Sequence, residues 1–378
     1  MKKHYLITIP TLAAGGMERA AINTAKQVLN EGNEVTFFLL CSSEIYYDIP
    51  QGANVICGKK DISDKLGMIK SLVKLRSTYK TIKPFCVLSF SSKHSSYVML
   101  ALSFLKPNIF VLHRSNPHTI YGKVNNWLNE HLFPKASALV VQTKTAKEFF
   151  CKKYYTKNVF IYPNPVREVI EYTPKMAENI IVTVGRLSKE KGINDLIEIF
   201  AYIGNKDWKL LIVGDGPERN NLEELARKFN IQEQVEFIGF TKNVDNYLKR
   251  AKIFAFASKT EGFPNALLEA MCTGIPCISY DCPTGPADMI INGNNGFLIE
   301  LNNKTEYQMH LKLLMENKDI RERFSAEAKK LKDRHRPDVI VKEFLENINL
   351  FSLYKEFYKS KDIPGKCKEI KGIENINI

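Results

Sequence analysis

One stretch of the chain, residues 253–280, has the order of strand, loop, helix and strand that builds a parallel sheet. It opens with the apolar run IFAFA, which has the length of a buried parallel strand. A polar loop then leads to Pro264, a residue suited to the first turn of a helix. The helix is expected to run to about Cys272, because Gly274 suits a C-cap. Residues 277–280 are then the next strand.

The same order of strand, loop and helix recurs along the rest of the chain. The other expected strands are residues 5–9, 34–41, 87–90, 109–112, 139–142, 159–161, 180–184, 209–213 and 235–238. Repeated βα units build doubly wound parallel sheets. The turn-prone run YPNPV at 162–166 divides the series. We therefore expect an α/β protein with two Rossmann-like domains, residues 1–165 and 166–337, and 378 residues suffice for both.

The excess positive charge lies in the first half of the chain. Residues 1–165 contain 22 Lys and Arg against 9 Asp and Glu, whereas residues 166–378 contain 32 of each. The net charge of +13 therefore belongs to the first domain. Such a surface attracts polyanions or anionic membranes. No recognised nucleic-acid motif accompanies it, so we expect no nucleic-acid partner.

Cysteine spacing and hydropathy indicate the cellular compartment of the protein. The eight cysteines contain no C-x-x-C pair, and nothing in their spacing requires an oxidising compartment. No apolar run reaches the ~20 residues that span a bilayer. The start MKKHYLITIPTLAAGG resembles a signal peptide, but Pro10 interrupts it, and a strand followed by a glycine loop explains it better. We expect a cytoplasmic protein, peripheral on the inner face of the cell membrane.

Two glutamates flank the start of the helix expected at residues 264–272. Glu261 lies in the loop before it, and Glu269 lies about two turns inside it. Free N–H groups at a helix start suit a phosphate, and carboxylates suit pairs of sugar hydroxyls. A nucleotide sugar carries both groups, so the arrangement predicts a nucleotide-sugar site. The alternative is that Glu261 is an ordinary loop acid and Glu269 a solvated helix residue.

The run EGFPNALLEAMCTGIPCIS closely resembles the glutamate–seven residues–glutamate motif of family-4 retaining glycosyltransferases with the GT-B fold. Two other runs resemble the same family: VGRLSKEKG at 184–192 is similar to its diphosphate clamp, and GGMER at 15–19 to its glycine loop. The resemblance covers roughly residues 5–350. It implies two domains facing each other across a cleft, and retaining, metal-independent hexosyl transfer from a nucleotide-activated donor, most often UDP-linked.

The resemblance also implies roles for single residues. Glu269 would accept hydrogen bonds from the ribose hydroxyls, and Glu261 would orient the sugar ring. Arg186 and Lys191 would neutralise the leaving diphosphate. The predicted donor site also contains Gly15, Gly16, Gly262, Phe263, Pro264 and Asn265. The sequence does not allow any residue to be assigned as the catalytic base. Neither a P-loop nor a D-x-D motif is present, so we expect no metal ion and no cofactor.

A polar cluster, HRSNP, follows the strand expected at residues 109–112. Ligands of open α/β sheets bind at the carboxyl ends of strands, so His113 could hydrogen-bond a sugar hydroxyl and Arg114 could offset phosphate charge. We take His113 as a catalytic candidate and Arg114 as an acceptor candidate. A structural role for both residues is the alternative.

Residues 59–83 form an amphipathic segment in the first domain. The segment holds eight Lys or Arg against two Asp, with apolar residues at helical spacing. It is either a solvated helix face or a cationic surface for a lipid head group or diphosphate. The candidate contacts are Lys65, Lys70, Lys74 and Lys80. A second basic and aromatic cluster spans residues 147–157.

The last third of the chain bears on the acceptor. Residues 281–288 resemble a subgroup of these enzymes that adds N-acetylhexosamine or hexose units to bacterial polyprenyl-diphosphate-linked glycans such as O-antigen, capsule and protein glycan. The expected partners are a UDP-sugar, a polyprenyl-diphosphate-linked saccharide and an anionic membrane surface. Residues 338–358 are expected to form a helix that packs back on the first domain, before a polar tail at 359–378.

Two other functional classes stay open. A nucleotide-sugar epimerase also has two Rossmann-like domains and would need no acceptor. A non-catalytic protein could bind a nucleotide sugar or an anionic lipid without transferring anything. The charge imbalance and the motifs favour the transferase over both.

Overall fold

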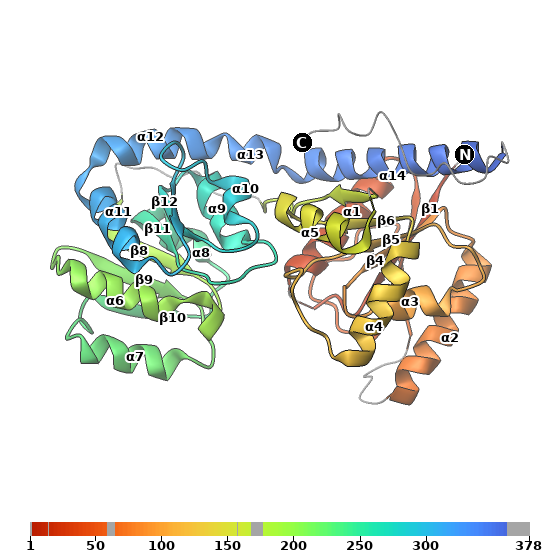
Figure 1. Ribbon diagram of the computed structural model, residues 1–378, viewed down its shortest axis with the longest axis horizontal. Coiled ribbons are helices and arrows are strands. Elements are labelled where there is room, and N and C mark those ends of the chain that lie inside the picture. Colours follow the sequence, from red (N-terminus) through yellow and green to blue (C-terminus); the bar gives the residue numbers. More distant parts are fainter. Residues whose placement is uncertain (1, 14, 59–64, 157, 168–176, 361–378) are drawn as a thin grey trace.

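The structure is a computed structural model that describes residues 2–13, 15–58, 65–156, 158–167 and 177–360. Within these residues the chain forms two domains, each built on a parallel sheet with helices on both faces (Figure 1). The predicted α/β fold with two Rossmann-like domains is confirmed.

Seven described strands form the sheet of the first domain, in the order β3-β2-β1-β4-β5-β6-β7. They are β1 (His4–Ile9), β2 (Glu34–Leu39), β3 (Asn54–Cys57), β4 (Cys86–Phe90), β5 (Ile109–Leu112), β6 (Ala138–Val141) and β7 (Val159–Ile161). All neighbouring strands are parallel. The strand order reverses between β1 and β4. Such a reversal opens a crevice at the carboxyl ends of the strands, where ligands of α/β proteins bind.

The sheet of the second domain has six described strands in the order β10-β9-β8-β11-β12-β13. They are β8 (Glu178–Val184), β9 (Lys209–Val213), β10 (Val235–Gly239), β11 (Ala251–Phe256), β12 (Cys277–Asp281) and β13 (Phe297–Glu300). These strands are also parallel. Here the order reverses between β8 and β11. The loops that follow these two strands carry the predicted diphosphate clamp and Glu261.

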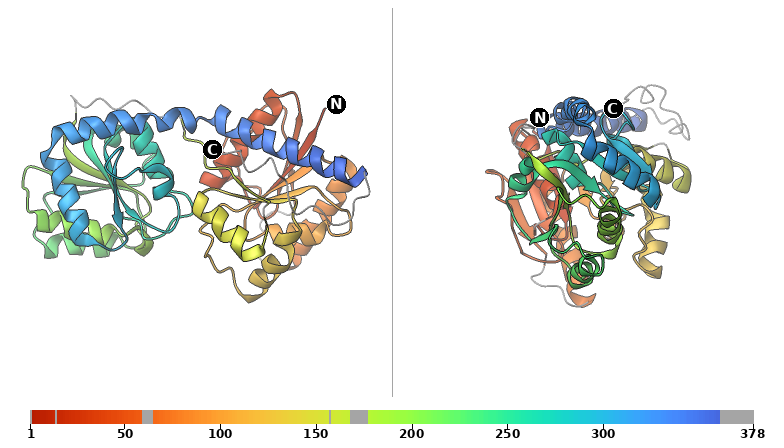
Figure 2. Two further views of the ribbon diagram at one scale, coloured as in Figure 1. Left: turned by 45° about the horizontal axis from the view of Figure 1, so that its top comes forward. Right: turned by 90° about the vertical axis from the view of Figure 1, so that its left-hand side faces the viewer.

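Helices cover both faces of the first sheet. One face packs against α1 (Gly16–Asn30) and α14 (Pro337–Ser360), whose apolar residues share one core with the strands. The other face packs against α2 (Lys65–Ile82), α3 (Ser95–Ala101), the short turn η1 (Phe133–Lys135) and α5 (Lys144–Tyr154), and α4 (Lys123–Leu132) lies against α3. The last helix, α14, thus returns from the second domain and runs along the first (Figures 1 and 2).

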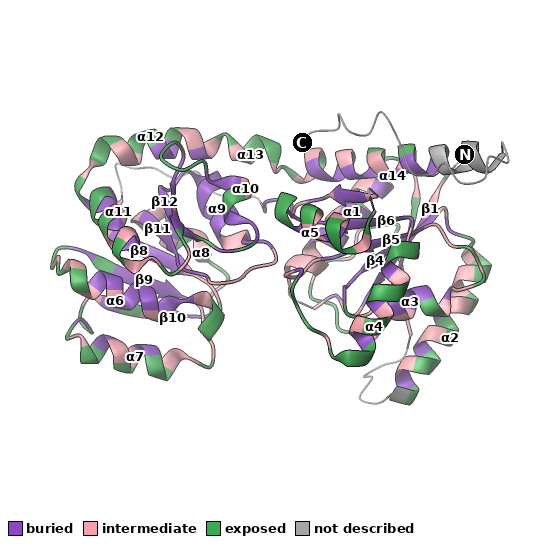
Figure 3. Cartoon of the chain, viewed as in Figure 1, coloured by how far each residue is buried: buried purple, intermediate pink, exposed green. Residues whose placement is uncertain are grey.

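The second sheet is covered in the same way. One face packs against α6 (Ile193–Ile203), α7 (Arg219–Lys228), α11 (Lys304–Glu316) and α12 (Lys318–Lys329). The other packs against α8 (Val244–Arg250), α9 (Asn265–Thr273) and α10 (Pro286–Met289). The short helix α13 (Leu331–Arg334) precedes α14. Burial follows this layering, with purple strands inside and green outer helix faces in Figure 3.

The central βα unit agrees with its sequence-based prediction. β11 leads through the loop at 257–264 into α9, and Gly274 ends that helix with a φ of 91°, a left-handed conformation that glycine adopts without strain. Pro264 is the N-cap, one position before the first helical residue.

Two chain segments connect the domains. Residues 162–167 lead from β7 to the second domain, and α13 with α14 leads back. Tyr162 of the first connection stacks on Phe344 of α14 with ring centroids 4.1 Å apart. The backbone N–H of Val166 donates to the carbonyl of His335 at 2.8 Å. The two connections are therefore packed against each other. Among the described helices, none combines the length and the apolar content of a membrane-spanning segment.

Candidate active site

A polar cleft of about 510 Å³ lies between the two domains. Its walls come from the loop after β5 on one side and from the loops after β8 and β11 on the other. The lining residues are Asn116, His118, Thr119, Glu190, Lys191, Thr260, Glu261 and Gly262. Asn116 donates a hydrogen bond to the hydroxyl of Thr260 across the domain boundary. The cleft therefore contains side chains from both domains at the carboxyl ends of their strands.

Glu261 and Lys191 form the central pair of this cleft. Lys191 Nζ lies 2.5 Å from Oε1 of Glu261, and the hydroxyl of Ser258 donates to the same oxygen at 2.6 Å. The side chain of Glu261 is only 10% exposed. Its backbone carbonyl also accepts from the hydroxyl of Thr284. A carboxylate held by two donors has a fixed direction, and its remaining lone pairs can accept from ligand hydroxyls.

Arg186 and Lys191 lie on the loop between β8 and α6. The short turn η3 (Lys189–Lys191) ends at Gly192, whose φ of 62° bends the chain beside the carbonyl of Ala257. Arg186 is exposed. The pKa of the neighbouring Glu190 is lowered chiefly by a hydrogen bond from Ser188, with smaller contributions from the charges of Lys191 and Arg186. The loop therefore presents two cations at the end of the strand next to Glu261.

Glu269 binds two arginines. Its Oε1 accepts from Arg19 Nη2 at 3.1 Å, and its Oε2 accepts from Arg167 Nε at 2.8 Å. Arg167 in turn makes a bidentate pair with Asp245, at 2.8 and 2.7 Å. Arg19 belongs to α1 of the first domain, so this ion-pair network joins the two domains. The carboxylate of Asp245 is the first cause of the raised pKa of Arg167.

Sequence reasoning did not place Arg167 or Asp245 in the site. Arg19 could have been predicted from the sequence, because it ends the run GGMER that resembles the family's glycine loop. Arg167 and Asp245 lie outside the three runs that resemble the family.

Glycines allow the domains to approach each other closely. A Cβ on Gly262 would lie 2.8 to 3.0 Å from backbone atoms of Ser115 and Asn116 in the first domain. A Cβ on Gly16 would lie 2.7 Å from the amide nitrogen of Asn265. Asn265 also accepts from the side chain of Asn164 at 2.9 Å. Of the predicted donor residues, Gly16, Gly262 and Asn265 therefore lie where the two domains meet. Gly15 immediately precedes α1, and Phe263 and Pro264 lie in the loop before α9.

His113 and Arg114 are both largely enclosed. His113 packs against Phe150 with ring centroids 4.7 Å apart and the ring planes tilted by 56°. Burial lowers the pKa of His113 to about 3, so the ring is neutral near pH 7. Arg114 donates to the carbonyl of Tyr162 at 2.6 Å and to the side chain of Asn164 at 3.2 Å. Arg114 therefore fixes the interdomain connection to the first domain. Its contact with an acceptor stays a prediction, as does a catalytic role for His113.

The predicted cationic helix is α2, which begins at Lys65. Residues 59–64 and the side chain of Lys65 lie outside the described part of the chain. Lys70, Lys74 and Lys80 are exposed, although Lys74 also donates to the carbonyl of Cys57 at 2.8 Å. The apolar residues of the segment do not share one face. Leu72, Leu75 and Tyr79 pack on the core, whereas three others are exposed: Leu66, Ile69 and Val73.

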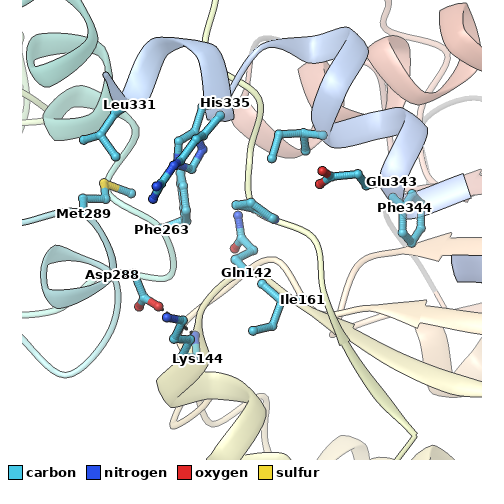
Figure 4. A pocket seen from close by; sticks show the side chains of 13 residues that line it. Gln142, Lys144, Ile161, Phe263, Asp288, Met289, Leu331, His335, Glu343 and Phe344 are labelled. Carbon is cyan, nitrogen blue, oxygen red and sulfur yellow. Dashed lines mark hydrogen bonds between the residues drawn. The ribbon is translucent and has the colours of Figure 1, made fainter. Parts of the chain in front are cut away.

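A second interdomain cavity, of about 140 Å³, lies beside the connections. It is lined by residues of both domains and of the returning helices, among them Gln142, Phe263, Met289 and His335 (Figure 4). On its wall the backbone N–H of Lys144 donates to Asp288 at 3.0 Å. Phe263 belongs to the predicted donor site, whereas Gln142, Met289 and His335 had no sequence signal. They hold the domains together on the side of α13 and α14.

The described residues contain no group of three or more His, Cys, Asp or Glu that could hold a metal ion. Metal independence stays a prediction.

Comparisons with known proteins agree with this geometry. Residues 168–331 match the family model described as glycosyl transferases group 1. An uncharacterised glycosyltransferase of Haemophilus influenzae is 27% identical over 353 residues, covering 91% of this chain and 99% of that protein. A Campylobacter jejuni enzyme, named N-acetylgalactosamine-N,N'-diacetylbacillosaminyl-diphospho-undecaprenol 4-alpha-N-acetylgalactosaminyltransferase, is 26% identical over 343 residues, covering 85% of this chain and 93% of the enzyme.

A solved structure has the same architecture along nearly the whole chain. HepE of Anabaena, solved in complex with UDP, superimposes with a TM-score of 0.77 and 17% identity, covering 92% of this chain and 100% of that one. The two parallel-sheet domains, the shared architecture and the family match identify the fold as GT-B. Residues 168–331 therefore form a glycosyl transferases group 1 domain within a chain that has the GT-B fold.

Proposed function

We propose that this chain transfers an N-acetylhexosamine or hexose, with retention of configuration, from a UDP-linked donor to a polyprenyl-diphosphate-linked saccharide. The pairing of Lys191 with Glu261 at 2.5 Å carries the proposal. The two residues follow β8 and β11, the strands between which the order of the second sheet reverses. A cation for phosphate and a carboxylate for hydroxyls thus lie side by side, as the two halves of a nucleotide sugar require.

The nucleotide is proposed to lie mainly on the second domain. Glu269 has its two oxygens oriented by Arg19 and Arg167, and a carboxylate oxygen can accept more than one hydrogen bond. Its remaining acceptor capacity suits the two ribose hydroxyls. The diphosphate would then lie near Arg186, Lys191 and the glycine loop at 15–16, where backbone can approach it closely.

The proposed reaction breaks the bond between the anomeric carbon and the β-phosphate oxygen. The anomeric carbon bonds to the acceptor oxygen on the same face, and the leaving phosphate takes the acceptor's proton. Negative charge grows on the diphosphate as the bond breaks, so Lys191 and Arg186 stabilise the transition state more than the bound donor. Neither a metal ion nor a cofactor takes part in this proposal. Closure of the domains over the cleft would keep water from the anomeric carbon.

The Campylobacter enzyme's name supports a lipid-linked acceptor. Such an acceptor lies at a membrane, and the first domain is suited to an anionic surface. α2 exposes Lys70 and Lys80 next to Leu66, Ile69 and Val73, which are 60%, 57% and 65% exposed. Basic and apolar residues together on one helix favour binding at the lipid head groups. We therefore propose a cytoplasmic enzyme, peripheral on the inner face of the cell membrane.

A panel of UDP-sugars tests the proposal in two steps. The first measures protection of the full chain against thermal unfolding, and the second measures transfer to synthetic polyprenyl-diphosphate-linked saccharides. We expect one UDP-sugar to be consumed with wild type and consumed far more slowly with Glu261→Ala. Release of a free epimerised sugar from UDP-N-acetylglucosamine would favour an epimerase instead. Binding of UDP with neither hydrolysis nor transfer by any protein would favour a non-catalytic binding protein.

A further inference from the structure

The side chain of Lys259 joins the loop that carries Glu261 to helix α6. Lys259 Nζ lies 2.9 Å from Oδ2 of Asp195, a residue in the first turn of α6. Lys259 directly follows Ser258, whose hydroxyl donates to the carboxylate of Glu261 at 2.6 Å. An anchor on α6 is therefore attached next to the residue that orients Glu261.

Asp195 is buried and charged. Its side chain is 2% exposed, whereas the side chains of Lys259 and Lys304, which both pair with it, are 36% and 41% exposed. Burial alone would raise the pKa of Asp195, but the two lysines outweigh this effect and the pKa lies below its usual value. A buried carboxylate that is charged is costly without its cations, so Asp195 holds Lys259 in one position.

The backbone around Lys259 joins the Glu261 loop to the loop between β8 and α6. The N–H of Lys259 donates to the carbonyl of Glu190 at 2.8 Å. A Cβ on Gly192 would lie 2.1 Å from the carbonyl oxygen of Ala257 and 3.5 Å from Cε of Lys259. The stem of Lys259 therefore packs over Gly192 before its ammonium reaches α6. Contacts this close make the two loops shift together.

Lys304 pairs with the same carboxylate but belongs to a different part of the domain. Its Nζ lies 2.8 Å from Oδ1 of Asp195 and 2.5 Å from Oε2 of Glu198, both on α6. Lys304 is the first residue of α11, so these pairs join two helices that pack on the sheet. Asp195 therefore binds one lysine from the Glu261 loop and one from a helix of the scaffold.

We propose that Lys259, held by Asp195, is a positioning residue that sets where Glu261 meets the donor sugar. The inference rests on the proposed function, which assigns the sugar ring to Glu261. Lys259 acts through the loop backbone and Ser258, because its own ammonium is bound to α6. A misplacement of about 1 Å at a reacting centre can cost ~100-fold in rate. Loss of the anchor should therefore slow transfer, whereas the nucleotide, proposed to be bound by Glu269, should bind nearly as before.

The test compares Lys259→Met and Lys259→Arg with Lys304→Met, the matched control, all in the full chain. The rate is the release of UDP from UDP-glucose, UDP-galactose, UDP-N-acetylglucosamine or UDP-N-acetylgalactosamine, whichever wild type consumes fastest with the synthetic acceptors described above. Calorimetric titration measures the affinity for UDP.

We expect kcat of Lys259→Met to fall at least tenfold, with a Kd for UDP within threefold of wild type. Lys304→Met loses an ion pair to the same carboxylate and should keep at least half of the wild-type kcat. Lys259→Arg keeps a cation at this position and should have at least a third of the wild-type kcat.

An unchanged kcat in Lys259→Met would overturn the inference. Equal losses in Lys259→Met and Lys304→Met would also overturn it, because the pairs around Asp195 would then only stabilise the domain. The same holds for a tenfold loss of UDP affinity in Lys259→Met, which would place Lys259 against the diphosphate, and for a Lys259→Arg variant as slow as Lys259→Met.

Both lysines are partly exposed, so both Met variants should fold. Failure of the proposed function would show separately, as a wild-type chain that binds no UDP and releases none from any of the four donors.

Discussion

Arg19 Nη2 donates to Oε1 of Glu269 at 3.1 Å, and this contact joins the first helix of one domain to α9 of the other. Both side chains are mostly shielded, with 21% and 13% exposure, so the pair is less screened than a surface ion pair. Glu269 is also the residue proposed to bind the ribose. In the proposed function, nucleotide binding and the relative position of the two domains therefore depend on the same carboxylate.

Removing this interdomain pair should affect turnover more than nucleotide affinity. Arg19→Met leaves Glu269 bound to Arg167, so we expect the Kd for UDP to change less than threefold. The closed arrangement loses one partly buried ion pair, and kcat should fall about tenfold, or ~1.4 kcal/mol. Calorimetric titration and steady-state kinetics measure the two quantities. Lys26→Met on the same helix is the control. A tenfold loss of UDP affinity with unchanged kcat would contradict the closure role of Arg19.

Lys191→Ala should lose at least tenfold in kcat/KM, which corresponds to about 1.4 kcal/mol of transition-state stabilisation. The physical reason is that Lys191 both orients Glu261 and lies where the proposed diphosphate gains charge. Lys189→Ala changes an exposed lysine of the same turn and should keep at least half of the activity. Initial rates over a range of donor concentrations give the comparison. If Lys191→Ala has the rate of wild type, the diphosphate assignment is wrong.

Charge reversal on α2 should detach the protein from anionic vesicles. Each Lys or Arg near such a surface contributes about 1 kcal/mol, so Lys70→Glu with Lys80→Glu should weaken binding at least tenfold. Co-sedimentation with phosphatidylglycerol vesicles measures it, and affinity for UDP should stay the same. Lys206→Glu with Lys228→Glu reverses two exposed charges of the second domain as a control. Equal losses of UDP and vesicle binding would mean that α2 is structural or belongs to the donor site.

His335 should make the free energy of unfolding depend on pH. Burial lowers its pKa from 6.5 to about 4, so the folded chain keeps the ring neutral while the unfolded chain protonates it. Its contribution to stability is therefore present above pH 6.5 and is lost as the pH falls from 6.5 towards 4. His335→Gln should lower the number of protons taken up on unfolding in that range by about one.

Urea denaturation at several pH values between 7 and 4 measures this proton uptake from the slope of stability against pH. His131→Gln, at an exposed position, is the control and should keep the wild-type slope. A variant at His335 with that same slope would show that the ring is already solvated in the folded chain.

The sequence predicted the buried strands and the edge strands β7 and β10, but it missed the other two edge strands, β3 and β13. The central parts of β1, β8 and β11 read YLITI, IIVTV and IFAF, which are almost wholly apolar because both faces of these strands are covered. β3 (Asn54–Cys57) was missed because it is a short edge strand with a half-exposed pattern. β13 (Phe297–Glu300) is the opposite edge, and its four residues follow a turn without a long apolar run.

The sequence predicted only those site residues that belong to a recognised motif. Glu261 and Lys191 are 70 residues apart, and their pairing follows from a resemblance and from the sheet order, not from local periodicity. The pairing of Arg167 with Asp245 had no motif to reveal it. Helical periodicity alone was misleading for α2, because it places Ile69 and Leu72 on one apolar face of the helix. In the folded domain only Leu72 packs on the core.

The return of α14 to the first domain has a consequence for biosynthesis. Ile340, Phe344 and Ile348 of that helix are buried in the same core as β1 and α1. A ribosome makes these two ends of the core about three hundred residues apart, so the half that is translated first cannot finish its interior until the last turns have emerged. Until then the apolar surface of the first domain that α14 covers stays exposed and can bind chaperones. A fragment that ends after the interdomain connection would expose this surface permanently.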